Sequence, residues 1–488
     1  MPLNPHYFCF MSHRRILFFV LCLSSLFASA QDKWDLQRSV EYALANNISV
    51  KQQDVQARLA ELIHYQSKFG RLPSANIGTS LGINTGRSID RTTNLFTTQS
   101  IFYTGLNFQT NVDLFNFFSK QNTIAGNRYE AEASQAAVAK IKNDISLNVA
   151  AAYLQALLAV EQVNISEVQV KQTSAQLTNT RKLVDAGSIP ELNAAELEAQ
   201  LARDSSTLIT AQGSVIRAIL TLKALLNVDP GMQFEIATPA VEQIPVEPIS
   251  ELQPEQVYEL ALRNLPQQRM NNLRIQSAQK FVAAARGEMY PSVSLSANLQ
   301  TNYSSLKNVP DESNAIFLAR PIGIVKGSGD TVLTQGVDPR SLRFYASTFS
   351  TQFSDNVYNG VGVNISIPLF NGLMAKTSWK RAKLNVTTYE LQRDQDNLTL
   401  KQDIYTAYTD AITAFEKFNA SKKSVQAAQK ASDYAQKRYD IGLLNTIDLI
   451  TNQNNLFRAR IELISAQFDY VFRLKVLEFY KGQGIKLR

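Results

Sequence analysis

The chain has 488 residues, a formal net charge of +7, two cysteines and three histidines. This mild positive balance, without any block of Lys and Arg, does not indicate a nucleic-acid partner. Both cysteines, Cys9 and Cys22, and the histidines His6 and His13 lie at the N-terminal end. The rest of the chain therefore has no disulfide, no thiol nucleophile and no Cys/His cluster for a metal, and we expect no cofactor.

The N-terminus has the pattern of a secretory signal. Arg14 and Arg15 precede the apolar run 16–26, and Ala28-Ser29-Ala30 has the form of a cleavage site. The alternative is a membrane helix, but the run is too short to cross about 30 Å of hydrocarbon. We therefore predict that residues 1–30 are a signal peptide. No later stretch approaches about 18 consecutive apolar residues, so any membrane crossing has to use strands.

Two structural repeats account for the rest of the chain, the first over 31–240 and the second, which opens with a proline-rich linker, over 241–488. Apolar residues at helical spacing dominate both repeats, and short stretches of period two interrupt them. The elements predicted in the first repeat are a helix over 34–70, strands over 74–84 and 104–115, a long helix over 119–186 and a helix over 190–227. Those predicted in the second are a helix over 254–287, strands over 291–301 and 359–369, a long helix over 373–441 and a helix over 446–481.

The repeats share residues at a fixed spacing. A shift of 255 residues superimposes Gly187 on Gly442 and Leu114-Phe115-Asn116 on Leu369-Phe370-Asn371. A duplicated pattern of this length indicates one supersecondary unit used twice.

The earlier segments match at a smaller shift of 218 residues, which superimposes Pro73 on Pro291. The difference of 37 residues places an insertion in the second hairpin, between about Tyr303 and Tyr358. Because this segment is polar and contains glycine, we expect it to be a loop on the outer, solvent side of the strands.

The long helices exceed the usual length in globular proteins. Residues 119–185 contain no proline and would extend roughly 100 Å as a helix. Helices of this length need coiled-coil-like packing. The second long helix has the apolar residues that such packing needs, at seven-residue intervals: Leu384, Leu391, Leu398, Tyr405 and Ile412. Two shorter helices stacked end to end would match one long helix in each repeat.

The four predicted strands are about ten residues long and alternate apolar with polar residues, as at Val361, Val363 and Ile365. Both features suit strands tilted across an outer membrane. A soluble, half-buried sheet would show the same alternation but would need a covering layer. Four strands in lipid leave two open edges with unpaired backbone groups. We therefore predict that several copies complete one barrel, surrounded by outer-membrane lipid.

Two helix-turn-helix segments carry a family resemblance: Tyr439-Asp-Ile-Gly442-Leu-Leu-Asn-Thr-Ile-Asp448-Leu449 and Val184-Asp-Ala-Gly187-Ser-Ile-Pro-Glu-Leu192-Asn193. Together with Pro368-Leu-Phe-Asn-Gly372, they resemble the TolC-like outer-membrane efflux protein family over nearly the whole chain after residue 30. The resemblance implies a mainly α fold with a small antiparallel β part. The duplicated helix–hairpin–long helix–helix unit would form a trimeric, 12-stranded transmembrane β-barrel that continues into a periplasmic α-helical barrel.

The same resemblance implies a function. The chain would be a homotrimeric, passive exit duct of the Gram-negative outer membrane, extending into the periplasm, for a tripartite efflux or type I secretion system. A periplasmic adaptor protein would couple it to an inner-membrane pump of the RND, ABC or a similar class. No Gly-rich phosphate loop, Ser/His/Asp set or paired carboxylates indicate an enzyme. The alternatives are a barrel-anchored trimeric structural or adhesive coiled coil, which the duplication disfavours, and a periplasmic helical adaptor, which the two hairpins disfavour.

Gly187 and Gly442 follow the two long helices. Glycine tolerates the left-handed conformation that commonly ends a helix, so each is at least a C-terminal cap. By the family resemblance, both turns, with Tyr439, would form the tips at which the adaptor docks. The two copies differ, because Val184 stands in the first where Tyr439 stands in the second.

Asp448 is the candidate for a pore constriction. It is expected as the third residue of a helix capped by Asn445, where an acid is favoured. In three copies it would also form a ring of charge that favours cations. These interpretations are compatible. Ser188 with Glu191 suggests a similar capping box in the first copy, but Asn193 stands there in place of Asp448, so the acidic ring is weaker.

Overall fold

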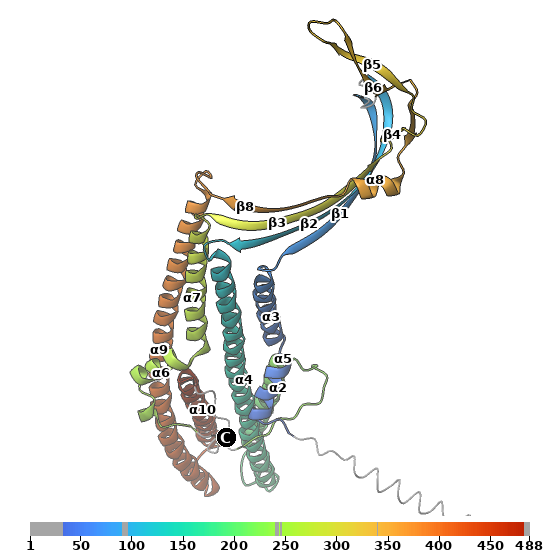
Figure 1. Cartoon of the computed structure of the whole chain (residues 1–488). Coiled ribbons are helices and arrows are strands. Elements are labelled where there is room, and N and C mark those ends of the chain that lie inside the picture. The colour runs from blue at the N-terminus through green and yellow to red at the C-terminus, as the bar shows by residue number, and fades with distance from the viewer. Residues whose placement is uncertain (1–32, 90–95, 240–243, 245, 339, 483–488) are drawn as a thin grey trace, which may run out of the picture. The chain divides into compact units, whose positions relative to one another are not determined.

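The computed structural model describes residues 33–89, 96–239, 244, 246–338 and 340–482 (Figure 1). The predicted signal peptide, residues 1–30, lies outside the described residues. The chain divides into two compact units, and both repeats contribute to each. The helical unit comprises 1–60, 130–275 and 388–488, and the sheet unit comprises 61–129 and 276–387.

The elements that the two repeats share follow the same order, and they confirm a mainly helical chain with a small antiparallel part. In the first repeat the elements are α2 (Leu36–Asn46), α3 (Ile48–Phe69), β1 (Ser74–Ile89), β2 (Phe96–Phe115), α4 (Ser119–Asp185) and α5 (Glu191–Leu226). In the second they are η3 (Ile249–Glu251), α6 (Pro254–Asn264), α7 (Pro266–Gly287), β3 (Ser292–Ser304), β4 (Asn308–Asp311), β5 (Phe317–Ile324), β6 (Thr331–Val337), β7 (Arg343–Ala346), α8 (Phe349–Asp355), β8 (Tyr358–Ser366), α9 (Met374–Asp440) and α10 (Thr446–Tyr480).

The single helices predicted over 34–70 and 254–287 are each two helices. Asn47 and Leu265, which are 218 residues apart, both leave the helical conformation, with ψ at 131°. Asn47 restarts the chain as α3, because its side-chain oxygen accepts a hydrogen bond from the Ser49 N–H at 2.9 Å. Leu265 precedes Pro266, whose ring disfavours helical conformation in the residue before it.

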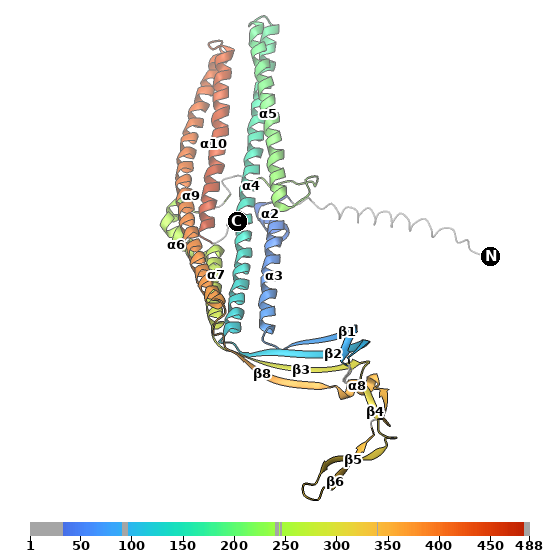
Figure 2. The same cartoon turned by 90° about the horizontal axis from the view of Figure 1, so that it is seen from above.

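The long helices α4 and α9 have 67 residues each. Figure 2 shows α4 beside α5 and α9 beside α10. Two consecutive left-handed residues precede each long helix: Phe117 and Phe118 in the first repeat, and Gly372 and Leu373 in the second. This conformation costs roughly 1 kcal/mol for a residue with a Cβ atom. The same backbone conformation therefore precedes both long helices, although the side chains differ.

One helix, α5, is long and apolar enough by length and composition to cross a membrane, among the helices of the described residues. It also carries Asp204, Arg217 and Lys223. Leu197, Leu222 and Leu226 of α5 are buried in the helical unit, whereas Ile209 and Ile216 between them are exposed.

The sheet unit contains an antiparallel four-stranded sheet of order β1-β2-β3-β8. Ile77 on β1 lies opposite Phe108 on β2, which lies opposite Leu299 on β3. A register shift between Asp113 and Phe115 interrupts the β2–β3 ladder just before the strand ends. β1 and β8 are the two edges of this sheet.

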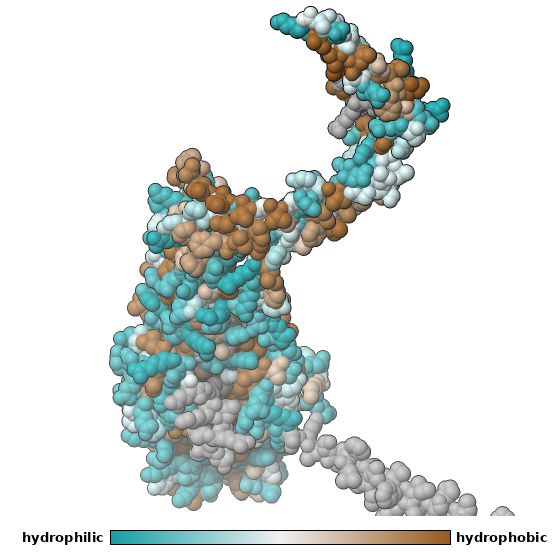
Figure 3. Space-filling model, viewed as in Figure 1, coloured by the Kyte–Doolittle hydropathy of each residue, from teal (hydrophilic) through white to brown (hydrophobic). Residues whose placement is uncertain are grey.

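The apolar face of the sheet is exposed. Ile77 is 72% and Val361 is 77% accessible to solvent, and Leu81, Val363 and Ile365 on the same face are also exposed. Figure 3 shows hydrophobic residues gathered over this part of the molecule. The covering layer that a soluble sheet needs is therefore not provided by the described part of the chain.

The insertion predicted as a polar loop is instead structured and partly apolar. It forms two two-stranded sheets, β4–β7 and β5–β6, and the short helix α8. The prediction weighed the charged residues and glycines of this segment and missed its alternation, in which Phe317, Ile322 and Leu333 are exposed apolar residues.

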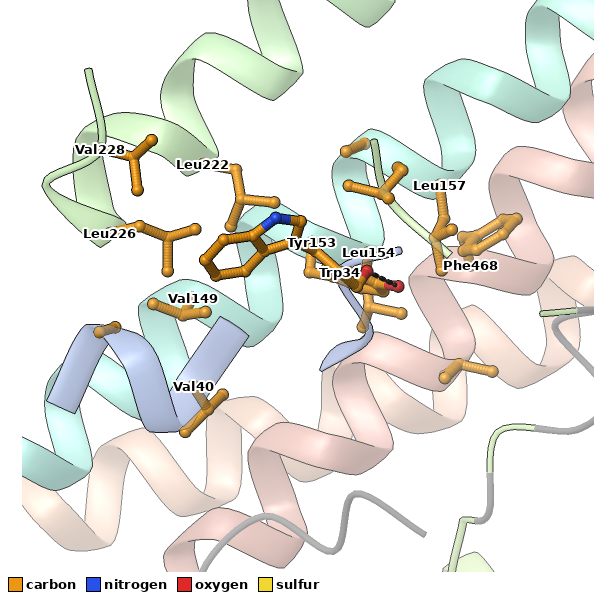
Figure 4. Packing of buried hydrophobic residues seen from close by; sticks show 14 residues of the cluster. Trp34, Val40, Val149, Tyr153, Leu154, Leu157, Leu222, Leu226, Val228 and Phe468 are labelled. Carbon is orange, nitrogen blue, oxygen red and sulfur yellow. Dashed lines mark hydrogen bonds between the residues drawn. The ribbon is translucent and has the colours of Figure 1, made fainter. Parts of the chain in front are cut away.

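A core in the helical unit joins the N-terminal segment, α4, α5 and α10 (Figure 4). Trp34 forms a parallel bridge with Ile236 at its centre. The buried Tyr153 hydroxyl lies 3.1 Å from the carbonyl oxygen of Trp34 and 2.6 Å from that of Ala237. It donates its proton to these acceptors and thereby fixes α4 to both strands of the bridge. Burial raises the pKa of the Tyr153 hydroxyl.

A second core joins the linker, α6, α9 and α10 through buried apolar residues: Leu252, Val257, Ala261, Leu265, Ile404, Ala407, Ala411, Leu474 and Leu477. Beside it, Lys475 and Glu478 form a buried ion pair of 2.8 Å. Glu478 also accepts a hydrogen bond of 2.7 Å from the Glu247 N–H. A buried charge that loses its partner is strongly destabilising, so these contacts fix the linker to α10.

Candidate functional site

The turns after the two long helices have the same backbone geometry. Gly187 has φ +73° and Gly442 has φ +74°. In the first turn the Ser188 N–H donates to the Leu183 carbonyl at 2.9 Å, and the Gly187 N–H donates to the Val184 carbonyl at 2.8 Å. This is the Schellman arrangement, which satisfies the last carbonyl groups of a helix.

The second turn repeats this pair of hydrogen bonds. The Leu443 N–H donates to the Arg438 carbonyl at 2.8 Å, and the Gly442 N–H donates to the Tyr439 carbonyl at 2.9 Å. Both glycines therefore act as helix caps, and the turns are defined by the backbone rather than by side chains.

The helices that follow the turns begin differently. Asn445 caps α10, because its side-chain oxygen accepts a hydrogen bond of 2.7 Å from the Asp448 N–H. Asp448 is exposed in the first turn of α10. In the first repeat the predicted capping box is wrong, because the N-cap residue is Pro190 and makes no side-chain cap hydrogen bond. Ser188, the predicted cap, belongs to the preceding turn instead, where its N–H donates to the Leu183 carbonyl.

Exposed apolar residues surround the turns. They are Leu183 and Leu192 at the first, and Ile441, Leu443 and Ile447 at the second. Figure 2 shows the two turns at the same end of the helical unit. The turns thus present a polar backbone and apolar side chains at one end of the helices.

Uncharged side chains connect the two helical hairpins near these turns. The Tyr439 hydroxyl on α9 lies 3.2 Å from the Thr180 hydroxyl on α4. Gln453 on α10 donates a hydrogen bond of 2.7 Å to Gln176 on α4. We call these four residues the hydroxyl–amide seam. Val184 stands in the first repeat in place of Tyr439 and has no hydroxyl. The first repeat therefore cannot form the equivalent of the Tyr439–Thr180 hydrogen bond.

A second contact between the hairpins lies farther along α5 and α10. Gln200 and Asn454 exchange amide hydrogen bonds of 3.0 and 3.3 Å. The buried Asp204 accepts hydrogen bonds of 2.6 Å from Gln200 and from the Thr173 hydroxyl. The negative charge of Asp204 is thus held by donors from α4 and α5.

A polar cleft of about 500 Å³ lies along the hydroxyl–amide seam. Its lining is rich in amides and includes Gln169, Gln172, Gln176, Gln429, Gln436 and Gln453. Such side chains bind water as readily as one another. Beside the cleft, the buried residues Leu177, Ala194, Leu197 and Ile450 form a small apolar cluster that joins α4, α5 and α10.

The predicted site residues fall into two places. Gly442, Tyr439 and Asp448 lie at the α9–α10 turn, and Gly187 lies at the α4–α5 turn. The sequence interpretation missed Thr180 and the glutamines of the seam. Glutamines at seven-residue intervals on α4 (162, 169 and 176) and on α9 (429 and 436) are the signal that could have identified it.

No group of three His, Cys, Asp or Glu residues is placed to hold a metal ion within the described residues. The arrangement offers two turns, a hydrogen-bonded seam and an exposed acid.

Comparisons with known proteins concern the family and the fold. The family model for outer membrane efflux proteins matches residues 40–228 and 257–482. No curated protein matches the chain. The solved structures that it resembles include CusC, at 18% identity and a TM-score of 0.72, with 93% of each chain covered.

Two further solved structures have similar folds. The outer membrane protein VceC of Vibrio cholerae is 17% identical, with a TM-score of 0.68 over 92% of this chain and 97% of that one. The outer membrane channel MtrE of Neisseria gonorrhoeae, in its open state, is 18% identical, with a TM-score of 0.69 over 92% and 89%. At these identities the likeness concerns the fold.

Proposed function

Because the chain belongs to the outer membrane efflux protein family, we propose that three copies form a passive exit duct in the outer membrane, coupled through a periplasmic adaptor to an inner-membrane pump. The exposed apolar face of the four-stranded sheet is the observation that carries the proposal. Its side chains, such as Ile77 and Val361, are suited to contact lipid.

The open edges of the sheet support assembly of several copies. β1 and β8 each pair on one side within the described chain. In hydrocarbon, each unpaired backbone group costs several kcal/mol, so both edges need partners. Three copies joined β8 to β1 give a closed barrel of twelve strands with no free edge.

Two exposed seams on the helices support the same assembly. On α3, Ile48, Val55, Leu62 and Phe69 recur at seven-residue intervals, and all four are exposed in the single chain. On α9, Leu391, Leu398 and Ile412 are exposed at the same spacing. Apolar residues at this interval form coiled-coil seams, so each copy has an apolar stripe for a neighbour on both helices.

Native mass spectrometry of the detergent-extracted, full-length protein tests the assembly, and planar bilayers test the duct. We expect trimers, stepwise conductance, and restored drug resistance in an efflux-deficient host that also carries the matching adaptor and pump. A folded monomer that is stable in water without detergent would contradict the proposal.

For the adaptor we propose the two turns, with Gly187, Gly442 and Tyr439 as the positions that shape them. Exposed apolar residues such as Leu443 and Ile447 offer contact area there. Replacing Gly442 with Trp should distort the turn and reduce both adaptor cross-linking and efflux. Normal efflux with normal cross-linking would exclude docking at this turn.

For the pore constriction we propose a ring of three Asp448 side chains, one from each copy. The support is that Asp448 is exposed while its helix is capped by Asn445. A carboxylate that is not needed to cap its helix is available to attract cations in the channel.

A further inference from the structure

The β5–β6 hairpin of the insertion has an unusual surface. We call residues 316–338 the apolar hairpin. Every residue of β5 is exposed, and Ile322, Ile324 and Leu333 are 67%, 72% and 57% accessible. Figure 3 shows hydrophobic residues over this segment, which Figure 1 labels β5 and β6. A loop that contacts only water has no physical reason to expose so much apolar surface.

The apolar hairpin belongs to a fixed arm. At the base of the arm, the buried Gln352 of α8 accepts a hydrogen bond of 3.0 Å from the Ser304 N–H and donates one of 3.0 Å to the Ser304 carbonyl. Phe349 packs against Tyr303 on β3, with 5.3 Å between the ring centres. Farther out, the Asp338 N–H donates to the Ile316 carbonyl at 2.8 Å and closes the hairpin.

Each strand of the apolar hairpin has a free edge. Within the described residues β5 pairs with β6 alone. Apolar side chains lie on both faces of this ribbon, because the adjacent residues Phe317 and Leu318 point to opposite faces. A two-stranded ribbon of this kind is marginally stable by itself, and its edges are ready to pair with another strand.

The unpaired edges limit which partner can cover the hairpin. Lipid would cover the apolar faces but would leave the edge N–H and C=O groups unpaired, which hydrocarbon does not tolerate. The tip, from Lys326 to Asp330, is also polar. A partner that satisfies both features is another strand with apolar side chains.

The charges of the hairpin indicate which strand. Both cations, Arg320 and Lys326, lie on the β5 side, and both anions, Asp330 and Asp338, lie on the β6 side. None of the four forms an ion pair within the described part of the chain. The aliphatic stem of Arg320 lies against Gly336. Placing β6 beside β5 of a second copy joins opposite charges, whereas two β5 strands or two β6 strands would repel.

We propose that the apolar hairpins of three copies pair head to tail, with β5 of each copy beside β6 of the next, in one closed collar. The proposal rests on the trimeric duct proposed above. In a ring of hairpins the neighbouring strands alternate in direction, so each new contact is antiparallel, like the β5–β6 ladder itself. A contact that repeats head to tail closes into a ring under three-fold symmetry.

Cysteine cross-linking in the full-length protein tests the collar. The chain after residue 30 has no cysteine. Ala319→Cys on β5 and Gln335→Cys on β6 mark opposite positions of one hairpin. Each substitution is placed in a separate, differently tagged chain, so every cross-link joins two copies. After co-expression and treatment of whole cells with a bis-maleimide, we expect a dimer that carries both tags.

The matched controls are the two chains expressed singly, in which β5 can meet only β5 and β6 only β6, and both should give little dimer. Asp330→Lys with Asp338→Lys should lower the yield of the mixed dimer about fivefold, because attraction becomes repulsion. Adding Arg320→Glu and Lys326→Glu to the same chains should restore it.

Three outcomes would overturn the collar. The first is no mixed dimer although native mass spectrometry shows trimers, which leaves the duct proposal intact. The second is an equal or greater yield from the β5-only chain. The third is quenching by brominated lipid of a fluorophore on Leu333→Cys, which would identify lipid as the contact. Absence of trimers in the same sample would overturn the duct as well.

Discussion

At the scale of the residue, the two turns of the helical unit depend on a backbone angle that glycine adopts without strain. A Cβ atom added to Gly442 would meet no atom within 4 Å. The requirement for glycine is therefore one of backbone conformation and not of space. The same holds for Gly187, so both helix ends can be tested without a steric clash.

We expect Gly442→Ala to destabilise the protein by about 1 kcal/mol, since alanine is strained at this angle. Gly213→Ala is the control, and for it we expect a change in stability in the opposite direction. Gly213 lies inside α5, where the new Cβ would lie 3.5 Å from Arg217. Alanine should stabilise the helix there by about 1 kcal/mol. Thermal unfolding of the detergent-solubilised variants measures both, and equal shifts would contradict the assignment of Gly442 as a left-handed cap.

Asp448→Asn should reduce the preference of the channel for cations and leave thermal stability within about 0.5 kcal/mol of the original. The small stability effect follows because Asn445 still caps α10. Reversal potentials in a salt gradient measure the preference. Asp54→Asn on α3 removes one negative charge far along the sequence from the turns and should leave the reversal potential unchanged. An unaltered preference in Asp448→Asn would exclude the ring.

Tyr480 makes stability depend on high pH. Burial, with the charges of Asp403 and Asp144, raises its pKa to about 12. The folded state therefore holds the phenolic proton more tightly than the unfolded state, whose pKa is about 10. This contribution is complete below pH 10 and is lost as the pH rises toward 12. Tyr480→Phe should flatten this part of the unfolding profile, and an unchanged loss of stability between pH 10 and pH 12 in this variant would contradict the assignment.

At the scale of the element, the hydroxyl–amide seam is a weak connection between the α4–α5 and α9–α10 hairpins. Its hydrogen bonds are between neutral groups, each worth about 1 kcal/mol net. The two larger apolar cores of the helical unit lie elsewhere, around Trp34 and Leu252, but a small cluster of Leu177, Ala194, Leu197 and Ile450 joins the hairpins beside the seam. Separating the ends of the hairpins therefore breaks the seam and this small cluster but leaves the two larger cores in place.

We expect Tyr439→Phe combined with Gln176→Ala to raise single-channel conductance, because the hairpin ends separate more easily. Gln429→Ala is the matched control. It removes a hydrogen bond of 2.6 Å from Arg460, which joins α9 to α10 within one hairpin. Planar-bilayer recordings measure the conductance of both variants. An equal rise in the control would contradict the idea that the seam holds the hairpin ends together.

The elements differ in how far the sequence reveals them. Long runs without proline at helical spacing predict α4 and α9, because local propensity and burial agree there. The break at Asn47 was missed because it depends on a local side-chain cap. The bond between Thr180 and Tyr439 was missed because it joins residues 259 positions apart. The strands of the insertion were missed because charged residues and glycines obscure their alternation.

At the scale of the whole molecule, assembly depends on apolar stripes that the single chain leaves exposed. We expect Val55→Asp, on the α3 seam, to convert trimers to monomers, because a charge on a buried seam is unfavourable. Gln56→Asp places the same charge on the next residue of the helix, off the seven-residue series, and should leave trimers intact. Native mass spectrometry distinguishes the two, and trimers in both variants would show that α3 is not at the interface.

The second core places a condition on when this protein can mature. Leu474, Leu477 and the paired charges Lys475 and Glu478 all come from α10, which follows every other described helix and strand. A chain that is exported N-terminus first delivers these residues after all the others. Until they arrive, the linker lacks the hydrogen bond to Glu478 and the apolar contacts that α10 provides. The core around Leu252 is therefore completed late in export, after α6 and α9 have already left the membrane.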